Sequence, residues 1–372
     1  MVGLAISCSD IANEKKLGED ERIKYAQIGV SYFEKIPLSL RNDTVYVLNA
    51  WGYLLYGWAG CVSDRDEREK LLGLAEKKYE NASIVDKNYA NVWGNWGWLL
   101  QNRIPYADKE GKLSLFEKSE DKYKLALKNH NFHFQTIINW AVLLRDKANL
   151  MENHSEKWTL LEQARLKAQL AIDINRENPD GWLHMGWILF EQSKLVGYRD
   201  RKDYGNPDIR KYLEEEDNRK REDLQNDAIQ YLNLAVLLKE DDFETLRCLG
   251  IIKVEIAKQE KSTERIVKLL EEADEFFNRS KLAKGKIRTR QLWCNWYEEL
   301  EMYKKYIRGR YKNEQIWKKQ EDIFLNGISE DKKHSDLYKK YCNTLDKMMS
   351  YEIDIYLKAL IEKKEKYCNS QK

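Results

Sequence analysis

The chain has 372 residues, of which 34% are charged and 12% are aromatic, with 12 Trp and only 4 Pro. A disordered chain would lack these aromatic residues, and the composition is typical of many amphipathic helices that each bury one stripe. Lys and Arg (64) nearly balance Asp and Glu (62), and this mixed-sign charge argues against a nucleic-acid binder, which usually carries a basic excess.

The first 42 residues are expected to be an N-terminal helical flank, with one helix over residues 19–36. Residues 2–6 are the only apolar run near the start, and no basic residue precedes them, so no signal peptide is predicted. No segment is long and apolar enough to span a bilayer. The six Cys are dispersed without a CxxC pair, which indicates reduced thiols of a soluble cytoplasmic protein without membrane contact.

Between residues 43 and 284, five segments repeat a small residue inside an aromatic and aliphatic pattern. The segments are residues 48–55, 93–100, 137–144, 182–189 and 246–253, and their small residues are Gly52, Gly97, Ala141, Gly186 and Gly250. Large residues three and four apart form one buried stripe of a helix, and the small residue allows a partner helix to approach closely.

Each segment is followed by a second pattern of small residues at helical spacing. These runs are Ala75-Tyr79-Ala82, Ser119-Tyr123-Ala126, Ala164-Ala168-Ala171, Ala228-Leu232-Ala235 and Ala273-Phe277-Ser280. From the last small residue of a run to the first large residue of the next segment there are 11 positions in all four cases, for example from Ala82 to Trp93. So regular a spacing predicts a stack of helix hairpins.

The two patterns resemble the two helices of a tetratricopeptide repeat, a W-x₂-L-G-x₂-Y helix followed by an A-x₃-F helix. The resemblance covers about residues 45–280 and implies an all-α fold, a right-handed α-solenoid of antiparallel helix hairpins. The spacing of 11 positions is similar to the junction between family repeats. The small residues of the two helices are 22 or 23 positions apart, and 42 in the fourth unit, against about 12 in the family. We therefore expect longer helices and longer turns inside each hairpin.

The fourth unit is longer than the others because it contains a charged insertion at residues 197–223. Charges of both signs, as in the run from Arg199 to Asp203, are typical of a solvated helix or loop. Tyr198, Tyr204 and Tyr212 lie among these charges, so a binding role for the insertion is the second interpretation.

Residues 285–372 form a C-terminal helical region in which the repeat pattern fades. The aromatic residues predict two further helices, and a long helix is expected from about 335 to 366; these aromatics are Trp293, Trp296, Tyr297, Tyr303, Tyr306 and Trp317. Terminal units of a solenoid must seal one open face, so a capping role is expected, with a docking surface for an oligomer as the alternative.

The resemblance implies that the first helices line a concave groove and that three slots around each small residue face it. We take as candidate protein- or peptide-binding residues Tyr53, Trp98 and Trp187 (one position after), Tyr56, Arg145 and Phe190 (four after), and Asn95, Asn139 and His184 (two before).

A side-chain amide can both donate to and accept from an extended peptide backbone, so Asn95 and Asn139 could hold a peptide without reading its sequence. The alternative is that these amides bridge neighbouring helices. The aromatic residues could anchor a partner, or they could be buried against the next unit.

Sequence motifs for chemistry are scarce. His130 and His133 could share a metal, but no Cys or carboxylate stands at ligand spacing, so no metal site is predicted. No HExxH, Walker, GxSxG or Gly-rich phosphate motif is present. We therefore predict a non-enzymatic scaffold or adaptor that binds a protein or extended peptide without a cofactor. The alternatives are a regulatory or sensor subunit of an effector enzyme, such as a protease or defence system, and an RNA-binding helical repeat.

Overall fold

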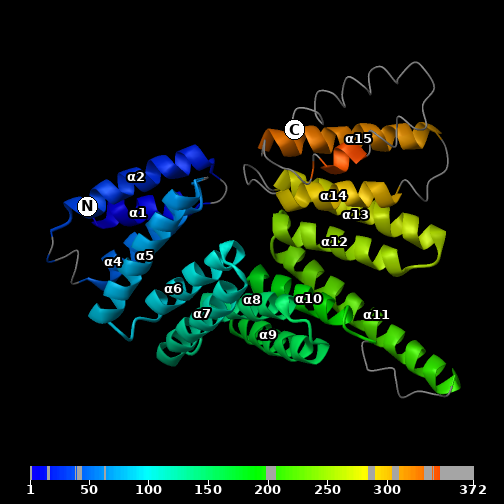
Figure 1. Ribbon diagram of the computed structural model, residues 1–372, viewed down its shortest axis with the longest axis horizontal. Helices are drawn as coiled ribbons and strands as arrows, with labels where there is room; N and C mark the ends of the chain where they lie inside the picture. The colour runs from blue at the N-terminus through cyan, green and yellow to red at the C-terminus, as the bar shows by residue number, and fades with distance from the viewer. Residues whose placement is uncertain are drawn as a thin grey trace. The chain divides into compact units, whose positions relative to one another are not determined.

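The computed structural model describes residues 2–14, 17–37, 39, 44–62, 64–197, 207–283, 290–303 and 310–330, together with 337 and 339–343. Within these residues all regular secondary structure is helical (Figure 1), which confirms the predicted all-α fold. The elements are α1 (Val2–Asn13), α2 (Glu19–Lys35), α4 (Val45–Ala59), α5 (Arg65–Val85), α6 (Ala90–Arg103), the 3₁₀ turn η1 (Ile104–Tyr106), α7 (Lys109–Asn129), α8 (Phe134–Leu150), α9 (His154–Ile174), α10 (Pro179–Ser193), α11 (Pro207–Leu238), α12 (Phe243–Gln259), α13 (Thr263–Ala283), α14 (Arg290–Tyr303) and α15 (Arg310–Glu330).

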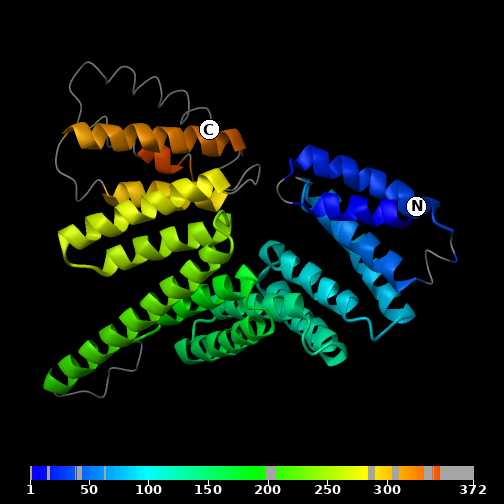
Figure 2. The same ribbon diagram turned by 180° about the vertical axis from the view of Figure 1, so that it is seen from behind.

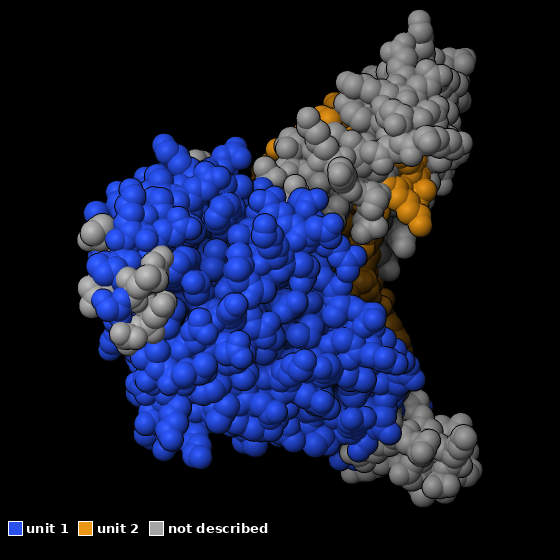
Figure 3. Space-filling view, turned by 60° about the vertical axis from the view of Figure 1, so that its left-hand side comes forward, with its two compact units in different colours: residues 1–240 blue, residues 241–372 orange. Residues whose placement is uncertain are grey.

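The chain divides into two compact units, residues 1–240 and residues 241–372 (Figure 3). Unit 1 contains the helices α1 to α11, and unit 2 contains α12 to α15. The division lies inside the predicted repeat region 43–284, and the boundaries proposed at residues 42 and 284 stay predictions from the sequence.

Each of the five aligned segments forms the first helix of a hairpin, and each small-residue run lies in the second helix (Figures 1 and 2). In unit 1 the pairs are α4 with α5, α6 with α7, α8 with α9 and α10 with α11; in unit 2, α12 pairs with α13. Within unit 1 each first helix from α4 to α10 also contacts the next first helix, whereas no comparable contact joins consecutive second helices among the described residues. The first helices therefore form the more closely spaced layer of this stack.

The constant spacing of 11 positions has a local cause at the end of each second helix. The last small residue accepts a backbone hydrogen bond from the residue four positions later, at 3.0 Å in every case; the acceptors are Ala82, Ala126, Ala171 and Ala235. In two junctions a tryptophan of the following helix adds a bond, because the indole N–H of Trp93 donates to the Lys87 carbonyl (2.7 Å) and that of Trp182 to the Arg176 carbonyl (2.8 Å). Repeated end geometry keeps the register of one hairpin on the next.

The small residue of each first helix faces a large side chain of its partner helix. A Cβ atom on the glycine would lie 2.5–2.8 Å from that side chain; the pairs are Gly52 with Tyr79, Gly97 with Tyr123, Gly186 with Leu232, and Gly250 with Phe277. Such distances are shorter than real Cβ contacts. The third hairpin has Ala141 in the small slot and Ala168, fully buried, in the facing slot, so the added methyl group is balanced by a smaller neighbour.

A cation–π contact also repeats in the first three of these hairpins. The ammonium group of a second-helix lysine lies over a first-helix indole: Lys78 over Trp51 at 3.4 Å, Lys122 over Trp96 at 3.5 Å, and Lys167 over Trp140 at 4.0 Å from the ring centroid. Burial lowers the pKa of Lys122 and of Lys167, which shows that these cations are partly withdrawn from water. Contacts of this kind contribute about 0.5–2 kcal/mol each, so they help to hold the hairpins closed.

The N-terminal flank is a hairpin of α1 and α2, and both helices pack against α4 (Figures 1 and 2). Helix α2 confirms the helix predicted over residues 19–36, whereas α1 was not predicted. The Ser9 hydroxyl donates to the Ala50 carbonyl (3.1 Å), and the Asn13 amide donates to the Tyr53 carbonyl (3.0 Å). These bonds fix α1 beside the first aligned segment.

Helices α14 and α15 of unit 2 correspond to the two helices predicted from the C-terminal aromatic residues. Their core includes the fully buried carboxyl group of Glu299, whose oxygens have no hydrogen-bond partner among the described residues. Burial, followed by the nearby Asp274, raises the pKa of Glu299 well above its usual range. Asp274 itself accepts from the Trp296 indole (2.7 Å) and pairs with Lys319 (2.5 Å). The long helix expected from 335 to 366 falls largely outside the described residues.

The charged insertion is helical from Pro207 onwards, as the first part of the 32-residue helix α11. Its residues Glu214–Glu216 are exposed, which agrees with a solvated helix for this portion. Tyr198 and Tyr204 lie outside the described residues, as does the side chain of Tyr212, so a binding role for the insertion stays a prediction.

Four cysteines are free thiols, with Cys8, Cys61 and Cys248 buried and Cys294 partly exposed. Cys342 is disulfide-bonded, so the expectation of reduced thiols is wrong for this residue. Among the residues that the structure describes, no helix combines the length and the apolarity needed to cross a bilayer.

Candidate functional site

The candidate site is the surface that α4, α6, α8 and α10 present in unit 1. Seven of the nine predicted binding residues are partly buried there, and we call them the first-helix face: Tyr53, Tyr56, Asn95, Trp98, Arg145, His184 and Trp187. Because consecutive first helices contact each other, residues in equivalent slots follow one another from helix to helix. The repeat thus places equivalent residues of four helices in one layer.

Three of these aromatic residues are brought together at the start of the array. The rings of Tyr53 and Tyr56 stack with centroids 6.3 Å apart, and Trp98 of the next hairpin hydrogen-bonds to Tyr56. Burial raises the pKa of Tyr56 to about 12, although the bond with Trp98 lowers it. Burial and the neighbouring Asp10 raise the pKa of Tyr53. Both phenols are therefore neutral hydrogen-bonding groups at physiological pH.

The two predicted amides differ in their exposure. Asn95 is half-exposed, and its Nδ2 donates to the Asn49 Oδ1 at 3.1 Å, so the amide bridges two hairpins and keeps free hydrogen-bonding capacity at Oδ1. Asn139 is only 6% exposed, and its Oδ1 accepts from Gln135 (3.0 Å). Of the pair, Asn95 is the amide that a partner could reach.

In the third and fourth hairpins the face is continued by Arg145, His184 and Trp187. The Arg145 guanidinium pairs with the Asp146 carboxylate at 2.8 Å, which neutralises much of its charge. Phe190 is wholly buried and lies beneath the Lys194 ammonium, which is 4.5 Å from its ring centroid. The structure thus corrects the placement of Phe190, because the last turn of α10 is covered and its ring belongs to the core.

The first helices are poor in charge compared with the second helices. Helix α4 has no charged residue and α6 has only Arg103, which pairs with Glu69 (2.8 Å) and Glu76 (3.0 Å) on α5. By contrast, ten of the 21 residues of α5, and ten of the 21 of α7, are charged. The remaining charged residues of the first helices of unit 1 are Arg145, Asp146, Lys147, Asp180 and Glu191. The face therefore presents aromatic rings and neutral polar groups, with few cations for phosphate.

Sequence reasoning missed the contribution of α1 to this surface. Asp10 lies close enough to Tyr53 to raise the pKa of its phenol, and Asn13 holds the Tyr53 backbone. The available signal was the spacing of small residues that α1 buries, namely Ala5, Cys8, Ser9 and Ala12, which follows the three- and four-residue periodicity of a helix face.

The histidine pair that was considered for a metal has other partners. Both ring nitrogens of His133 are engaged at 2.7 Å, Nδ1 with Thr136 and Nε2 with Asn91, so the ring links α6 to the start of α8. Burial, and then His130, lowers the pKa of His133. In the part of the chain that the structure describes, no group of three or more His, Cys, Asp or Glu side chains could hold a metal ion.

No protein-family model and no curated protein sequence matches this chain. Among solved structures it is similar to the human IFIT1 dimer with PPP-AAAA, at 10% identity and a TM-score of 0.50, over 89% of this chain and 71% of that chain. The chain has a tetratricopeptide-like repeat fold. It is also similar to a thermophilic TPR protein of Thermus thermophilus, at 14% identity and a TM-score of 0.41, over 64% of this chain and 98% of that one. A third match is a circular tandem repeat protein, at 11% identity, a TM-score of 0.30 and 99% and 94% coverage.

Proposed function

We propose that this tetratricopeptide-like array is a non-catalytic scaffold or adaptor that binds a protein or an extended peptide through the first-helix face. The observation that carries the proposal is the composition of that face, in which partly buried Tyr and Trp side chains and neutral polar groups replace the charges found on the second helices. Protein interfaces are depleted of charge at their centre and enriched in Tyr and Trp.

The residues have separable roles in this proposal. Tyr53, Trp98 and Trp187 supply apolar contact area, and Tyr53 and Trp187 add a hydroxyl and an indole donor. The free Oδ1 capacity of Asn95 accepts a backbone N–H of the partner. The partner segment is expected to be poor in charge itself, because a charged side chain would lose hydration on this face without finding a counter-charge.

Binding of RNA is the second candidate, and the IFIT1 structure with the oligonucleotide PPP-AAAA is the observation that favours it. Phosphate contacts require Lys and Arg, and the arginine of the first-helix face, Arg145, is already paired with Asp146. The charge distribution thus supports a protein partner over a nucleic acid. An oligoadenylate with a 5′-triphosphate, titrated at two salt concentrations, separates the two: tight binding with a steep salt dependence would establish the RNA function.

The proposal is tested by affinity capture from the native host with matched variants. We expect specific proteins to be recovered by the wild type and by Phe132→Ala, which removes a ring that is 63% exposed in a junction outside the face. The same proteins should be lost with Tyr53→Ala and Trp187→Ala. For a purified partner the Kd should rise about tenfold or more in each of these variants. Equal capture by all four proteins would refute the role of the face, and recovery of no specific protein would refute the scaffold function.

Two finer parts of the proposal, a regulatory role and a cytoplasmic location, have tests of their own. If the recovered partner is an enzyme whose activity changes when the array is added, the chain is a regulatory subunit. A cytoplasmic location is also proposed, because Cys8 and Cys61 are buried thiols outside any disulfide, whereas the disulfide-bonded Cys342 argues for an oxidising compartment. Fluorescence microscopy of a tagged chain checks the proposal, and a signal outside the cytoplasm would contradict it.

A further inference from the structure

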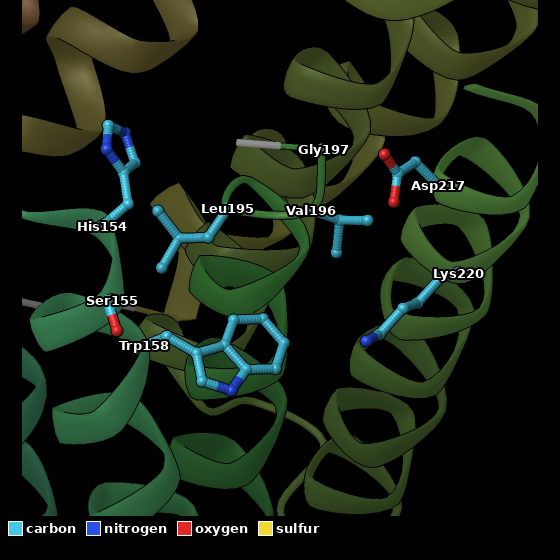
Figure 4. A pocket seen from close by; sticks show the side chains of 8 residues that line it. All are labelled: His154, Ser155, Trp158, Leu195, Val196, Gly197, Asp217 and Lys220. Atoms are coloured by element: carbon cyan, nitrogen blue, oxygen red, sulfur yellow. The ribbon is translucent and has the colours of Figure 1, made fainter. Parts of the chain in front are cut away.

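A pocket of 220 Å³ lies in unit 1 at the root of the charged insertion (Figure 4), and none of the residues of the first-helix face lines it. Three elements form it: the first turn of α9, the turn that follows α10, and the part of α11 around residues 217–220. Pockets for drug-sized ligands measure roughly 300–1,000 Å³, so the space suits a smaller molecule.

The walls of this pocket are held by hydrogen bonds within the protein. The Val196 carbonyl accepts from the guanidinium of Arg221 at 2.8 Å, which ties the turn to α11. Gly197 has a φ of 92°, in the left-handed region that other residues rarely adopt, and it turns the chain at the pocket's edge. On the opposite side Asn153 caps α9 by accepting from the backbone of Ser155 (2.9 Å) and Glu156 (3.1 Å). The pocket is thus pre-formed.

The lining combines an apolar part with two opposite charges. Trp158 of α9 and Leu195 and Val196 of the turn supply the apolar part. Asp217 and Lys220 stand three positions apart on α11, and Figure 4 shows both side chains on the side of the pocket facing Trp158. The Lys220 ammonium lies 5.3 Å from the Trp158 ring centroid.

Asp217 and Lys220 are close in sequence, yet no ion pair within 4.0 Å joins either of them to a residue that the structure describes. Lys220 does act on Glu162 of α9 at longer range: burial raises the pKa of Glu162, but hydrogen bonds from Arg165 and Gln192 and the charges of Arg165 and Lys220 lower it overall. Residues at this spacing on a helix commonly pair with each other. Here the two charges stay separate beside an apolar wall, where an opposite charge on a ligand would meet each of them. A molecule with one carboxylate, one ammonium group and an apolar side group satisfies all three parts of the lining.

We propose that this pocket binds a free α-amino acid with an aromatic or branched side chain. The ligand carboxylate accepts from Lys220, and the ligand ammonium donates to Asp217. The side chain lies against Trp158 and Leu195. This site is independent of the first-helix face, so its test and the test of the scaffold function succeed or fail separately.

The probes are L-phenylalanine and L-leucine, titrated to about 10 mM against the full chain and followed by isothermal calorimetry and saturation-transfer NMR, a range that covers weak specific binding. We expect at least one of them to bind. L-Phenylalaninamide lacks the carboxylate and N-acetyl-L-phenylalanine lacks the ammonium group, and each should bind about tenfold more weakly than L-phenylalanine if it loses one charge contact.

Variants of the lining residues test which side chain makes each contact with the ligand. Trp158→Ala, Asp217→Asn and Lys220→Met should each weaken binding about tenfold, a loss typical of one charge-assisted or aromatic contact. The matched controls Asp223→Asn and Arg219→Gln remove exposed charges of α11 outside the lining and should leave Kd unchanged. In the Asp217→Asn variant, N-acetylation of the ligand should cause no further loss of affinity.

Three outcomes would overturn the proposal: no binding of either amino acid to the wild type, equal affinity for the blocked analogues, or equal losses in the control variants. Circular dichroism of every variant shows whether the fold is intact, and a variant that unfolds is replaced by the milder Trp158→Phe or Lys220→Gln. The blocked analogues test the wild-type protein directly, so the result does not depend on any variant folding.

Discussion

The close approach of the paired helices predicts that the effect of Gly250→Ala on the stability of unit 2 changes sign when the facing ring of Phe277 is removed. In unit 2, a Cβ atom at Gly250 would lie 2.6 Å from Cε1 of Phe277, and 2.8 Å from both Cδ1 and Cζ. The ring is fully buried and is rigid, so the helices must separate to admit a methyl group. Overpacking of this kind costs about 1–3 kcal/mol, while Ala in place of Gly favours the helix by about 1 kcal/mol. Gly250→Ala should therefore destabilise unit 2 by up to about 2 kcal/mol.

Removal of the ring should reverse this effect. Phe277→Ala alone is expected to cost about 3–5 kcal/mol, because it leaves a cavity in the core. In that background the methyl group of Gly250→Ala enters vacated space, and the helix preference remains, so the second substitution should stabilise by about 1 kcal/mol. The third hairpin already carries the equivalent exchange, with Ala141 facing Ala168.

The measurement is a double-mutant cycle on the full chain, with guanidinium denaturation for the free energy of unfolding. Hydrogen exchange of α12 and α13 peptides, read by mass spectrometry, localises the change to unit 2. Gly73→Ala is the matched control, because a Cβ there would meet nothing within 4 Å, and it should stabilise α5 by about 1 kcal/mol. If Gly250→Ala destabilises both backgrounds equally, the contact with Phe277 is not the cause, and the reasoning fails.

Three further predictions concern single residues. Burial raises the pKa of Glu299, so the folded state binds more protons than the unfolded one. The stability of unit 2 should therefore fall as pH rises above about 4, and Glu299→Gln should flatten this slope in thermal denaturation. Burial lowers the pKa of His133, so unit 1 should instead lose stability as pH falls below about 6.5, and hydrogen exchange of the α8 start should show no such loss in His133→Gln. Asn153→Ala removes the cap of α9 and should lower the free energy of unfolding by about 1 kcal/mol in denaturant titration, whereas an unchanged value would mean that water replaces the cap.

The hairpin array could be predicted because its signals are local. Gly or Ala at a close approach, and a second-helix alanine that always stands 11 positions before the next hairpin, follow from backbone geometry within a few turns. Ala82 illustrates this, since its carbonyl accepts the hydrogen bond that ends α5. Helix α1 was not predicted from the sequence, because Ser9 and Asn13 make the segment polar. Their hydrogen-bond partners on α4 are not adjacent in the sequence. Their hydrogen bonds join residues about 40 positions apart.

The candidate site was less predictable, because exposure depends on what covers a slot. Tyr53, Trp98 and Trp187 are partly buried, and their role in binding stays a prediction. Phe190 stands in a slot equivalent to that of Tyr56, yet the end of α10 is covered and the ring is buried. The covering segments belong to the irregular fourth unit, where the spacing of the repeat no longer applies.

The junction between two hairpins and the turn inside one hairpin are under different physical constraints. This difference explains where the chain departs from the regular repeat. A junction between hairpins sets how consecutive first helices pack, and the three junctions of unit 1 between α5 and α10 each have four residues, as between Val85 and Ala90. A turn inside a hairpin only joins two helices that their side chains already hold together, and lengthening such a loop costs little. These turns accordingly vary: three residues after α8, five after α4, and thirteen between α10 and α11. The proposed amino-acid pocket lies at this variable end, whereas the first-helix face depends on the constant one. A new ligand site could therefore arise at the turns without disturbing the register on which a partner surface relies.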